Sequence, residues 1–157
     1  MKTDRSNDAD IALASGARLL IVTAPYYRVI TDLLLAGAEA AAAASNARVD
    51  HVLVPGAFEI PAAIAHAART GGHDGYIALG CVIRGETSHY DYVCGESARG
   101  LMDLSLQGLA IGYGILTVDT VEQANVRADP ARGNKGGDAS RACLAMIALK
   151  RSFAEPR

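Results

Sequence analysis

The chain has 157 residues, a length that one domain with its own hydrophobic core usually occupies. Its formal net charge is −2 at pH 7, which argues against the basic surface typical of proteins that bind nucleic acid or anionic membranes. Without such a surface, we expect a small-molecule ligand. Half of the residues are hydrophobic, which is rather high for a soluble chain, so we also expect apolar subunit interfaces.

The N-terminal stretch contains several aspartates and no continuous apolar run, so it matches neither a secretory signal nor a membrane span. We predict a flexible leader over residues 1–16, one domain over residues 17–157, and a cytoplasmic protein. The wide spacing of Cys81, Cys94 and Cys143 argues against a disulfide framework and against a clustered zinc site. We expect these three thiols to be buried and reduced.

The first half of the domain reads as strand, helix, strand, helix. A short apolar segment rich in β-branched residues predicts a strand over residues 18–23. Apolar residues at helical spacing follow from residue 30, and the alanine run 40–44 continues that helix. A second strand is predicted over residues 49–54, and a second helix over residues 58–69.

The second half repeats the alternation. A third strand is predicted over residues 75–80, a helix from Ser88 onward, a fourth strand over 110–117, a short helix over 122–127 and a longer helix over 138–153. For the last helix we expect these apolar residues to face inward: Ala142, Met146, Leu149 and Phe153.

This order predicts an α/β protein, a three-layer α/β/α sandwich with a four-stranded parallel sheet and right-handed crossovers. In such folds ligands bind outside the carboxyl ends of the strands. The residues expected there are 24–27, 55–59 and 81–89.

The segment from Gly80 to His89 is the strongest candidate for chemistry. It runs from an apolar strand through a glycine-containing turn to a helix start, where unpaired backbone N–H groups and the helix dipole favour an anion. Ser88 followed by Asp91 fits a helix-capping pattern. An imidazole can both donate and accept a proton near neutral pH, so His89 is a candidate acid/base group. On this segment alone, a solvated or capping histidine in a first helical turn is the more common interpretation.

Three further segments complete a recognisable set: Val54–Pro61 (VPGAFEIP), Gly114–Thr117 (GILT) and Gly133–Gly136 (GNKG). With the segment from Gly80 onward, they strongly resemble the 6,7-dimethyl-8-ribityllumazine synthase family from about residue 18 to the end of the chain. The resemblance implies a flavodoxin-like strand order and the condensation of 5-amino-6-ribitylaminouracil with 3,4-dihydroxy-2-butanone 4-phosphate. It implies no metal and no organic cofactor.

The resemblance also assigns roles to individual residues. His89 matches the proton-transfer histidine of the family. The residues that match its phosphate-binding positions are Glu86, Thr87, Arg127 and Lys135, with Glu86 acting through its backbone because its carboxylate would repel phosphate. The residues that match its pyrimidine- and ribityl-binding positions are Tyr26, Ala57, Phe58, Glu59, Cys81, Val82, Ile83 and Tyr113. Tyr26 would stack on the ring, although Tyr27 competes for that role.

In this family each active site lies between adjacent subunits of a pentamer, so Tyr113, Arg127 and Lys135 would meet His89 and Phe58 of a neighbour. Pentamer, decamer and larger assemblies of pentamers stay open. One alternative is a low-activity paralogue that binds flavin or lumazine or serves as a structural assembly. Another alternative is a flavin mononucleotide-binding protein. It is the weaker of the two, because the first strand-to-helix turn lacks the hydroxyl-rich loop expected around the phosphate of that nucleotide.

Overall fold

Four parallel strands form one sheet in the order β2-β1-β3-β4 in the computed structural model, which describes residues 13–156. The strands are β1 (Arg18–Thr23), β2 (Arg48–Leu53), β3 (Gly75–Ile83) and β4 (Ala110–Val118). The predicted parallel four-stranded sheet is therefore confirmed. Most of the predicted leader lies outside the described residues. Its last part packs inward, since Ala14 is buried and the Arg151 guanidinium donates to the carbonyl oxygen of Leu13 (2.7 Å).

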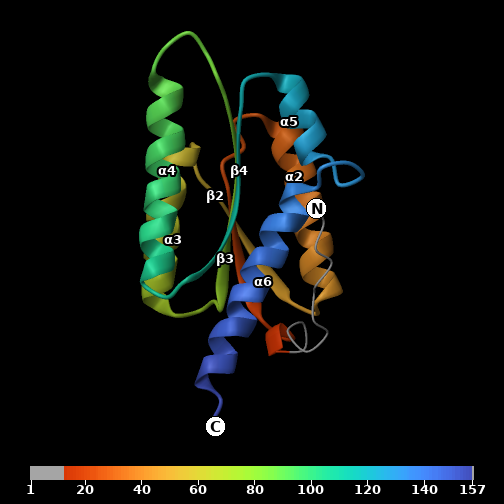
Figure 1. Ribbon diagram of the computed structural model, residues 1–157, viewed down its shortest axis with the longest axis vertical. Coiled ribbons are helices and arrows are strands. Elements are labelled where there is room, and N and C mark those ends of the chain that lie inside the picture. Colours follow the sequence, from red (N-terminus) through yellow and green to blue (C-terminus); the bar gives the residue numbers. More distant parts are fainter. Residues whose placement is uncertain (1–12, 157) are drawn as a thin grey trace.

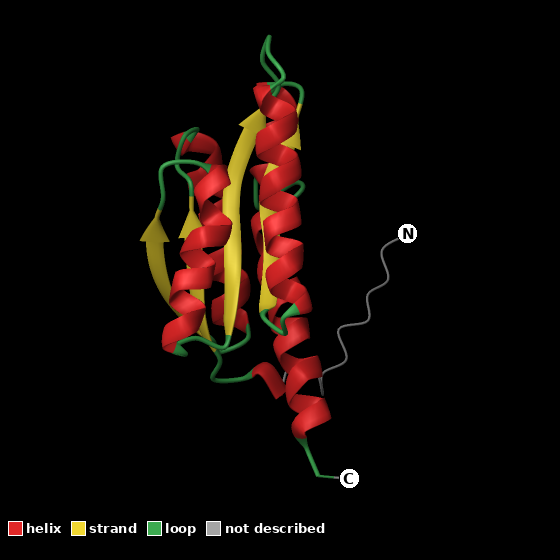
Figure 2. Cartoon of the chain, turned by 90° about the vertical axis from the view of Figure 1, so that its left-hand side faces the viewer, coloured by secondary structure: helices red, strands yellow, loops and turns green. Residues whose placement is uncertain are grey.

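Helices cover both faces of the sheet, as the three-layer prediction requires (Figures 1 and 2). One face carries α2 (Arg28–Ala44), α5 (Val121–Ala128) and α6 (Lys135–Ala154). The other carries the 3-10 turn η1 (Ala57–Glu59), α3 (Ile60–Thr70) and α4 (His89–Leu106). Across residues 13–156, none of these helices combines the length and apolar character that a bilayer crossing needs.

The third strand is longer than predicted, and the extra length shapes the site. Its pairing with β1 stops where Thr23 meets Leu79, whereas its pairing with β4 continues to Ile83. The N–H of Ala24 makes the last hydrogen bond on the β1 side, to the Leu79 carbonyl oxygen (2.9 Å). Beyond that point one edge of β3 has no neighbouring strand, and its backbone groups are open to another partner.

The two faces of the sheet have separate apolar cores. On the α2 and α6 face, Leu19, Ile21 and Leu79 pack with Leu34 and Cys143. On the α3 and α4 face, the largest fully buried side chains include Val22, Ile60 and Ile64. The three cysteines are free. Cys81 and Cys143 are buried as predicted, whereas the predicted burial of Cys94 is wrong, because this side chain on α4 is only half-buried.

The predicted inward face of α6 is wrong. Met146 and Phe153 are 48% and 75% exposed, and Ala142 and Leu149 are exposed beside them. The buried face consists mainly of smaller residues: Gly136, Gly137, Ala139, Ser140, Cys143, Leu144, Ile147 and Ala148. Small side chains bring the α6 backbone close to the sheet and to α2, so the larger apolar residues lie on the opposite side.

The GNKG segment starts α6 three residues earlier than predicted. Asn134 adopts a left-handed conformation (φ 49°) and caps the helix, with its side-chain oxygen accepting a hydrogen bond from the Gly137 N–H (3.2 Å). A Cβ at Gly133 would lie 2.8 Å from the Arg127 Cα, and one at Gly136 would overlap the Leu34 carbonyl oxygen. The glycines therefore let α6 approach α5 and α2 at backbone distance.

Candidate active site

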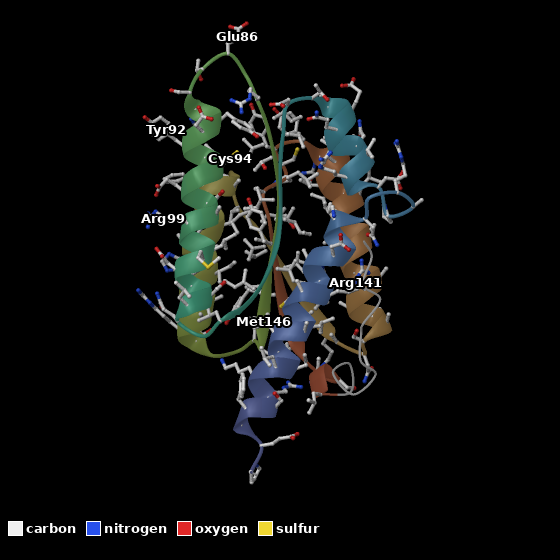
Figure 3. All side chains as sticks on the ribbon, viewed as in Figure 1. Glu86, Tyr92, Cys94, Arg99, Arg141 and Met146 are labelled. Atoms are coloured by element: carbon white, nitrogen blue, oxygen red, sulfur yellow. The ribbon has the colours of Figure 1, made fainter. Side chains whose placement is uncertain are left out.

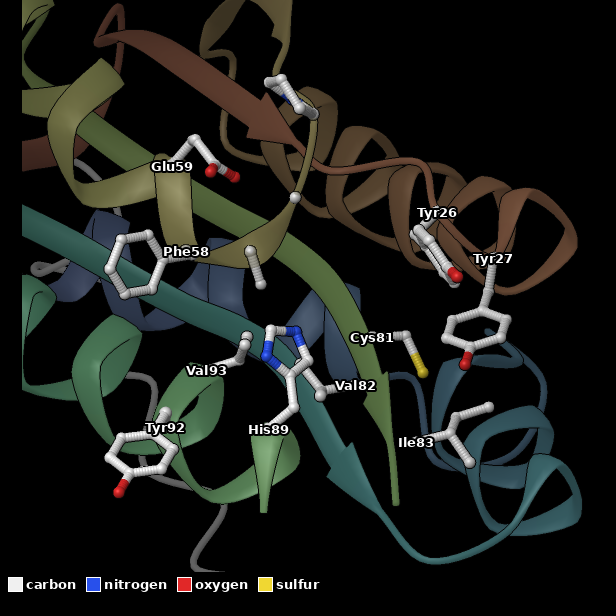
Figure 4. A pocket seen from close by; sticks show the side chains of 13 residues that line it. Tyr26, Tyr27, Phe58, Glu59, Cys81, Val82, Ile83, His89, Tyr92 and Val93 are labelled. Carbon is white, nitrogen blue, oxygen red and sulfur yellow. The ribbon is translucent and has the colours of Figure 1, made fainter. Parts of the chain in front are cut away.

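A cavity of about 600 Å³ lies at the carboxyl end of the sheet, between β3, η1, the start of α4 and the segment before α2. Figure 4 shows its side chains. His89 lies beside Val82, and Phe58 lies on the side of the cavity away from Tyr26 and Tyr27. The residues that line it are Tyr26, Tyr27, Pro55, Gly56, Ala57, Phe58, Glu59, Cys81, Val82, Ile83, His89, Tyr92 and Val93. All three chain segments expected at the carboxyl ends of the strands contribute to it.

Eight of the thirteen predicted site residues line this cavity. They are Tyr26, Ala57, Phe58, Glu59, Cys81, Val82, Ile83 and His89. The lining also includes Tyr92, which the sequence analysis missed. Tyr92 lies three residues after His89 on α4, and residues three apart share a helix face, so helical periodicity alone points to it. The predicted residues that do not line the cavity are Glu86, Thr87, Tyr113, Arg127 and Lys135.

Two adjacent tyrosines form one rim. Their ring centroids are 5.0 Å apart in an edge-to-face arrangement, which fixes the angle between the rings. Tyr26 is 77% exposed, whereas Tyr27 packs against the core on the α2 face. Burial raises the pKa of Tyr27, and the neighbouring Tyr26 and Cys81 add to the rise. Tyr26 thus presents a free ring face, and Tyr27 supports it from behind.

The floor of the cavity is the unpaired end of β3. Burial raises the pKa of the Cys81 thiol to about 11, so the thiol is protonated at neutral pH and acts as a small apolar group. Val82 and Ile83 follow it as half-buried residues. An apolar floor next to unpaired backbone N–H and C=O groups suits a flat heterocycle with polar edges.

The turn η1 supplies the wall opposite Tyr26. The N–H of Glu59 donates to the Gly56 carbonyl oxygen (3.1 Å), and this short turn buries Ala57 while Phe58 and Glu59 stay exposed. A Cβ at Gly56 would lie 3.0 Å from Glu59 Oε2. One aromatic ring and one carboxylate therefore face the cavity from neighbouring positions.

Residues 84–88 form an exposed loop that leads from β3 to His89, the first residue of α4. The predicted capping by Ser88 is wrong: Ser88 has a helical backbone conformation and no side-chain capping bond, and the Asp91 carboxylate pairs with Arg84 instead (3.5 Å). The N–H of His89 makes a long contact to Thr87 Oγ1 (3.4 Å). Glu86 lies at the outer tip of the loop in Figure 3.

The remaining predicted residues lie on other parts of the chain. Tyr113 is on the edge strand β4 and is 46% exposed; burial raises its pKa, with smaller contributions from Cys94 and Tyr90. Arg127 is in the last turn of α5. Lys135 opens α6, and its Nζ pairs with Asp138 Oδ2 (3.0 Å). Both helices cover the face of the sheet opposite α4 (Figure 1).

The composition of the site points to acid/base chemistry on organic substrates. Among residues 13–156, no three histidine, cysteine or acidic side chains gather as a metal site. The cavity combines one imidazole, one carboxylate, exposed aromatic rings and a protonated thiol. This set fits a flat polar ring and a group that exchanges protons with it.

Comparisons with known proteins point to one family. The family model for 6,7-dimethyl-8-ribityllumazine synthase matches residues 16–151. A protein of that name from Methylobacterium radiotolerans is 60% identical over 143 residues, covering 90% of this chain and 87% of the relative. Proteins of the same name from Sphingopyxis alaskensis and Erythrobacter litoralis are 56% and 52% identical over 137 residues, covering 87% of this chain and 97% and 98% of the relatives.

Proposed function

The chain belongs to the 6,7-dimethyl-8-ribityllumazine synthase family, and on this premise we propose which residues carry out its reaction. It condenses 5-amino-6-ribitylaminouracil with 3,4-dihydroxy-2-butanone 4-phosphate to the lumazine, phosphate and water, the penultimate step of riboflavin biosynthesis. The observation that supports the residue assignment is the cavity at the end of β3, where His89 faces an apolar floor and an exposed aromatic rim.

The pyrimidine binds on the floor formed by Cys81, Val82 and Ile83. Unpaired backbone groups at this strand end hydrogen-bond the polar edges of the ring, and Tyr26 stacks on its face. Phe58 and the backbone around Ala57 close the opposite side. Because its carboxylate is exposed next to the cavity, Glu59 accepts hydrogen bonds from the ribityl hydroxyls.

The phosphate of the second substrate binds at the loop before α4. Backbone N–H groups at Glu86 and Thr87, with the Thr87 hydroxyl and the positive end of the helix, hold the anion. Arg127 supplies a planar fork for two phosphate oxygens, and Lys135 supplies a further positive charge.

His89 transfers protons in several steps. The amine of the pyrimidine adds to the ketone, loss of water gives a Schiff base, phosphate leaves by elimination, and a second carbonyl closes the ring with loss of another water. Each step moves a proton between carbon, nitrogen or oxygen. One imidazole at the mouth of the cavity can serve these steps in turn.

We further propose a homopentamer whose active sites lie between subunits. Two observations support shared sites: Tyr113, Arg127 and Lys135 do not line the cavity of their own chain, and α6 exposes an apolar stripe that includes Met146 and Phe153. We place this assembly in the cytoplasm, in keeping with the unpaired, largely buried thiols.

A subunit-mixing experiment tests the shared site. His89→Ala and Arg127→Ala are unfolded, mixed in equal amounts and refolded, and lumazine formation is followed optically beside an enzyme-free control. If one subunit supplies His89 and its neighbour Arg127, about a quarter of the sites regain both groups by random assembly, and activity rises well above either variant alone. Each variant refolded by itself is the control. Activity no higher than the mean of the two would contradict a shared site.

The stacking role of Tyr26 predicts a selective binding defect. Stacking of a base on an aromatic ring contributes about 1–3 kcal/mol, so Tyr26→Ala should raise KM for the pyrimidine roughly tenfold, with a smaller change for the phosphate substrate. Tyr26→Phe keeps the ring and should stay within about twofold of the native value. A native KM in Tyr26→Ala would move the stacking role to Tyr27.

A further inference from the structure

The loop between β3 and α4 is tied to the rest of the chain by Arg84. All five loop residues, 84–88, are exposed, and a Cβ at Gly85 would meet nothing within 4 Å. Backbone hydrogen bonds secure its ends: the N–H of Arg84 donates to the Val118 carbonyl oxygen (2.9 Å), and the N–H of Asp91 to that of Ser88 (3.0 Å). The part between these ends needs a further constraint to hold one conformation.

The side chain of Arg84 supplies that constraint through three contacts. Its Nε donates to Asp119 Oδ1 (2.9 Å), in the turn between β4 and α5. Its Nη1 lies 3.5 Å from Asp91 Oδ1, in the first turn of α4. Its Cζ lies 4.2 Å from the centroid of the Tyr90 ring, a cation–π distance. Tyr90 and Asp91 directly follow His89, so Arg84 contacts the helical turn that carries the imidazole.

Asp119 is itself firmly placed. Its N–H donates to Gln123 Oε1 (2.8 Å), and the Gln123 N–H donates to Thr120 Oγ1 (3.2 Å), which forms a capping box at the start of α5. The guanidinium of Arg84 therefore connects the loop and the first turn of α4 to a capped helix end on the opposite face of the sheet.

The charge of Arg84 is matched by protein groups. Hydrogen bonding to Asp119, with the nearby Asp91 carboxylate, raises the pKa of Arg84. The Arg84 guanidinium already contacts two carboxylates and an aromatic ring, so its charge is balanced within the chain. Arg127 differs, because it makes no ion pair and no side-chain hydrogen bond within residues 13–156.

We propose that Arg84 is a positioning residue for the reaction. Through its contacts with Asp119, Asp91 and Tyr90, it fixes the position of the phosphate-binding loop relative to the helical turn that carries His89. This inference rests on the proposed role of the loop in binding phosphate. Reacting groups displaced by about 1 Å lose up to about a hundredfold in rate, whereas exposed ion pairs contribute little to stability. The effect of Arg84 should therefore appear in kinetics and phosphate affinity rather than in unfolding.

The test uses Arg84→Met, which keeps the aliphatic stem, in the full-length assembled protein. We expect KM for the butanone phosphate to rise and kcat to fall, each about tenfold, with KM for the pyrimidine within about twofold. The affinity for inorganic phosphate, measured by equilibrium dialysis, should fall about tenfold, and the melting temperature should stay close to native. Arg84→Lys should recover part of the loss, since it keeps the charge without the fork.

Two further variants separate positioning from other roles. Asp119→Asn should reproduce the direction of the Arg84→Met effect, and the double variant should be no worse than Arg84→Met alone, because Arg84→Met has already removed the contact with Asp119. Arg99→Met is the matched control: Arg99 also lies between two carboxylates, Glu96 and Asp103, but on the outer face of α4, and its loss should leave kinetics native.

Three outcomes would overturn the inference: native kinetics and phosphate affinity in Arg84→Met; a loss of activity that only follows a loss of folded protein; or an effect of Arg84→Met with none of Asp119→Asn, which would make Arg84 a direct phosphate ligand. The proposed function is judged separately on the native protein. Native turnover without an Arg84 effect would reject only the positioning role. Arg84-dependent phosphate binding without native turnover would support the part of the inference in which Arg84 orders the phosphate-binding loop, and would contradict the proposed function.

Discussion

His89→Ala is expected to lower kcat by about 10²-fold and to leave measurable activity. Proton transfer by a positioned side chain typically contributes 10²- to 10⁴-fold, and alanine cannot replace it. The cavity that brings the two substrates together is otherwise intact in this variant, so the contribution of proximity remains. Lumazine formation with both substrates at saturation, corrected for the enzyme-free condensation, measures the effect.

His66→Ala is the matched control for this change. His66 is exposed on α3 and does not line the cavity, so its loss should leave kcat native. A native kcat in His89→Ala, with the two KM values also native, would remove His89 from the proton-transfer role and leave the rate enhancement to substrate positioning.

Gly136→Ala is expected to cause a large loss of stability. A Cβ at this position would overlap the Leu34 carbonyl oxygen and lie 2.9 Å from the Leu34 Cα, and these are backbone atoms that no rotamer change can move. Overpacking of this kind typically costs about 1–3 kcal/mol, and a backbone clash lies at the upper end of that range. The free energy of unfolding, measured in urea, should therefore fall by about 3 kcal/mol.

Gly95→Ala provides the opposite expectation from the same substitution. Gly95 lies within α4, and a Cβ there would meet nothing within 4 Å. Alanine in a helix interior is favoured over glycine by about 0.5–1 kcal/mol, so this variant should unfold at slightly higher urea concentration than the native protein. Equal stability of Gly136→Ala and the native chain would show that α2 and α6 can separate without cost.

The order of strands and helices was predictable because short continuous apolar segments alternate along the chain with segments whose apolar residues recur at helical spacing. The segments 18–23 and 110–117 are short, β-branched and apolar, and each became a strand within one residue of its predicted bounds. The order of elements then predicted a parallel sheet, and it predicted that ligands bind at the edge formed by the carboxyl ends of the strands. Most of the cavity lining follows from that rule, since segments far apart in sequence end at the same edge.

The face of α6 was not predictable from the same periods. A search for large apolar residues selects Met146 and Phe153, whereas the helix buries Ala139, Ser140 and Cys143. Small residues contribute little to a pattern of hydrophobic side chains, yet they allow two backbones to approach most closely. The contact between Arg84 and Asp119 was equally hidden, because it joins two turns 35 residues apart in the chain, and only their packing at one end of the sheet brings them together.

The buried Cys81 thiol has a consequence for oxidation. Peroxides attack the thiolate form, and with a pKa of about 11 only about one Cys81 side chain in ten thousand is ionised at pH 7. The heterocycle site therefore has a sulfur atom on its floor that resists conversion to sulfenic acid. Turnover should survive exposure to hydrogen peroxide without an added reductant, even though a cysteine lies in direct contact with the space where the substrate binds.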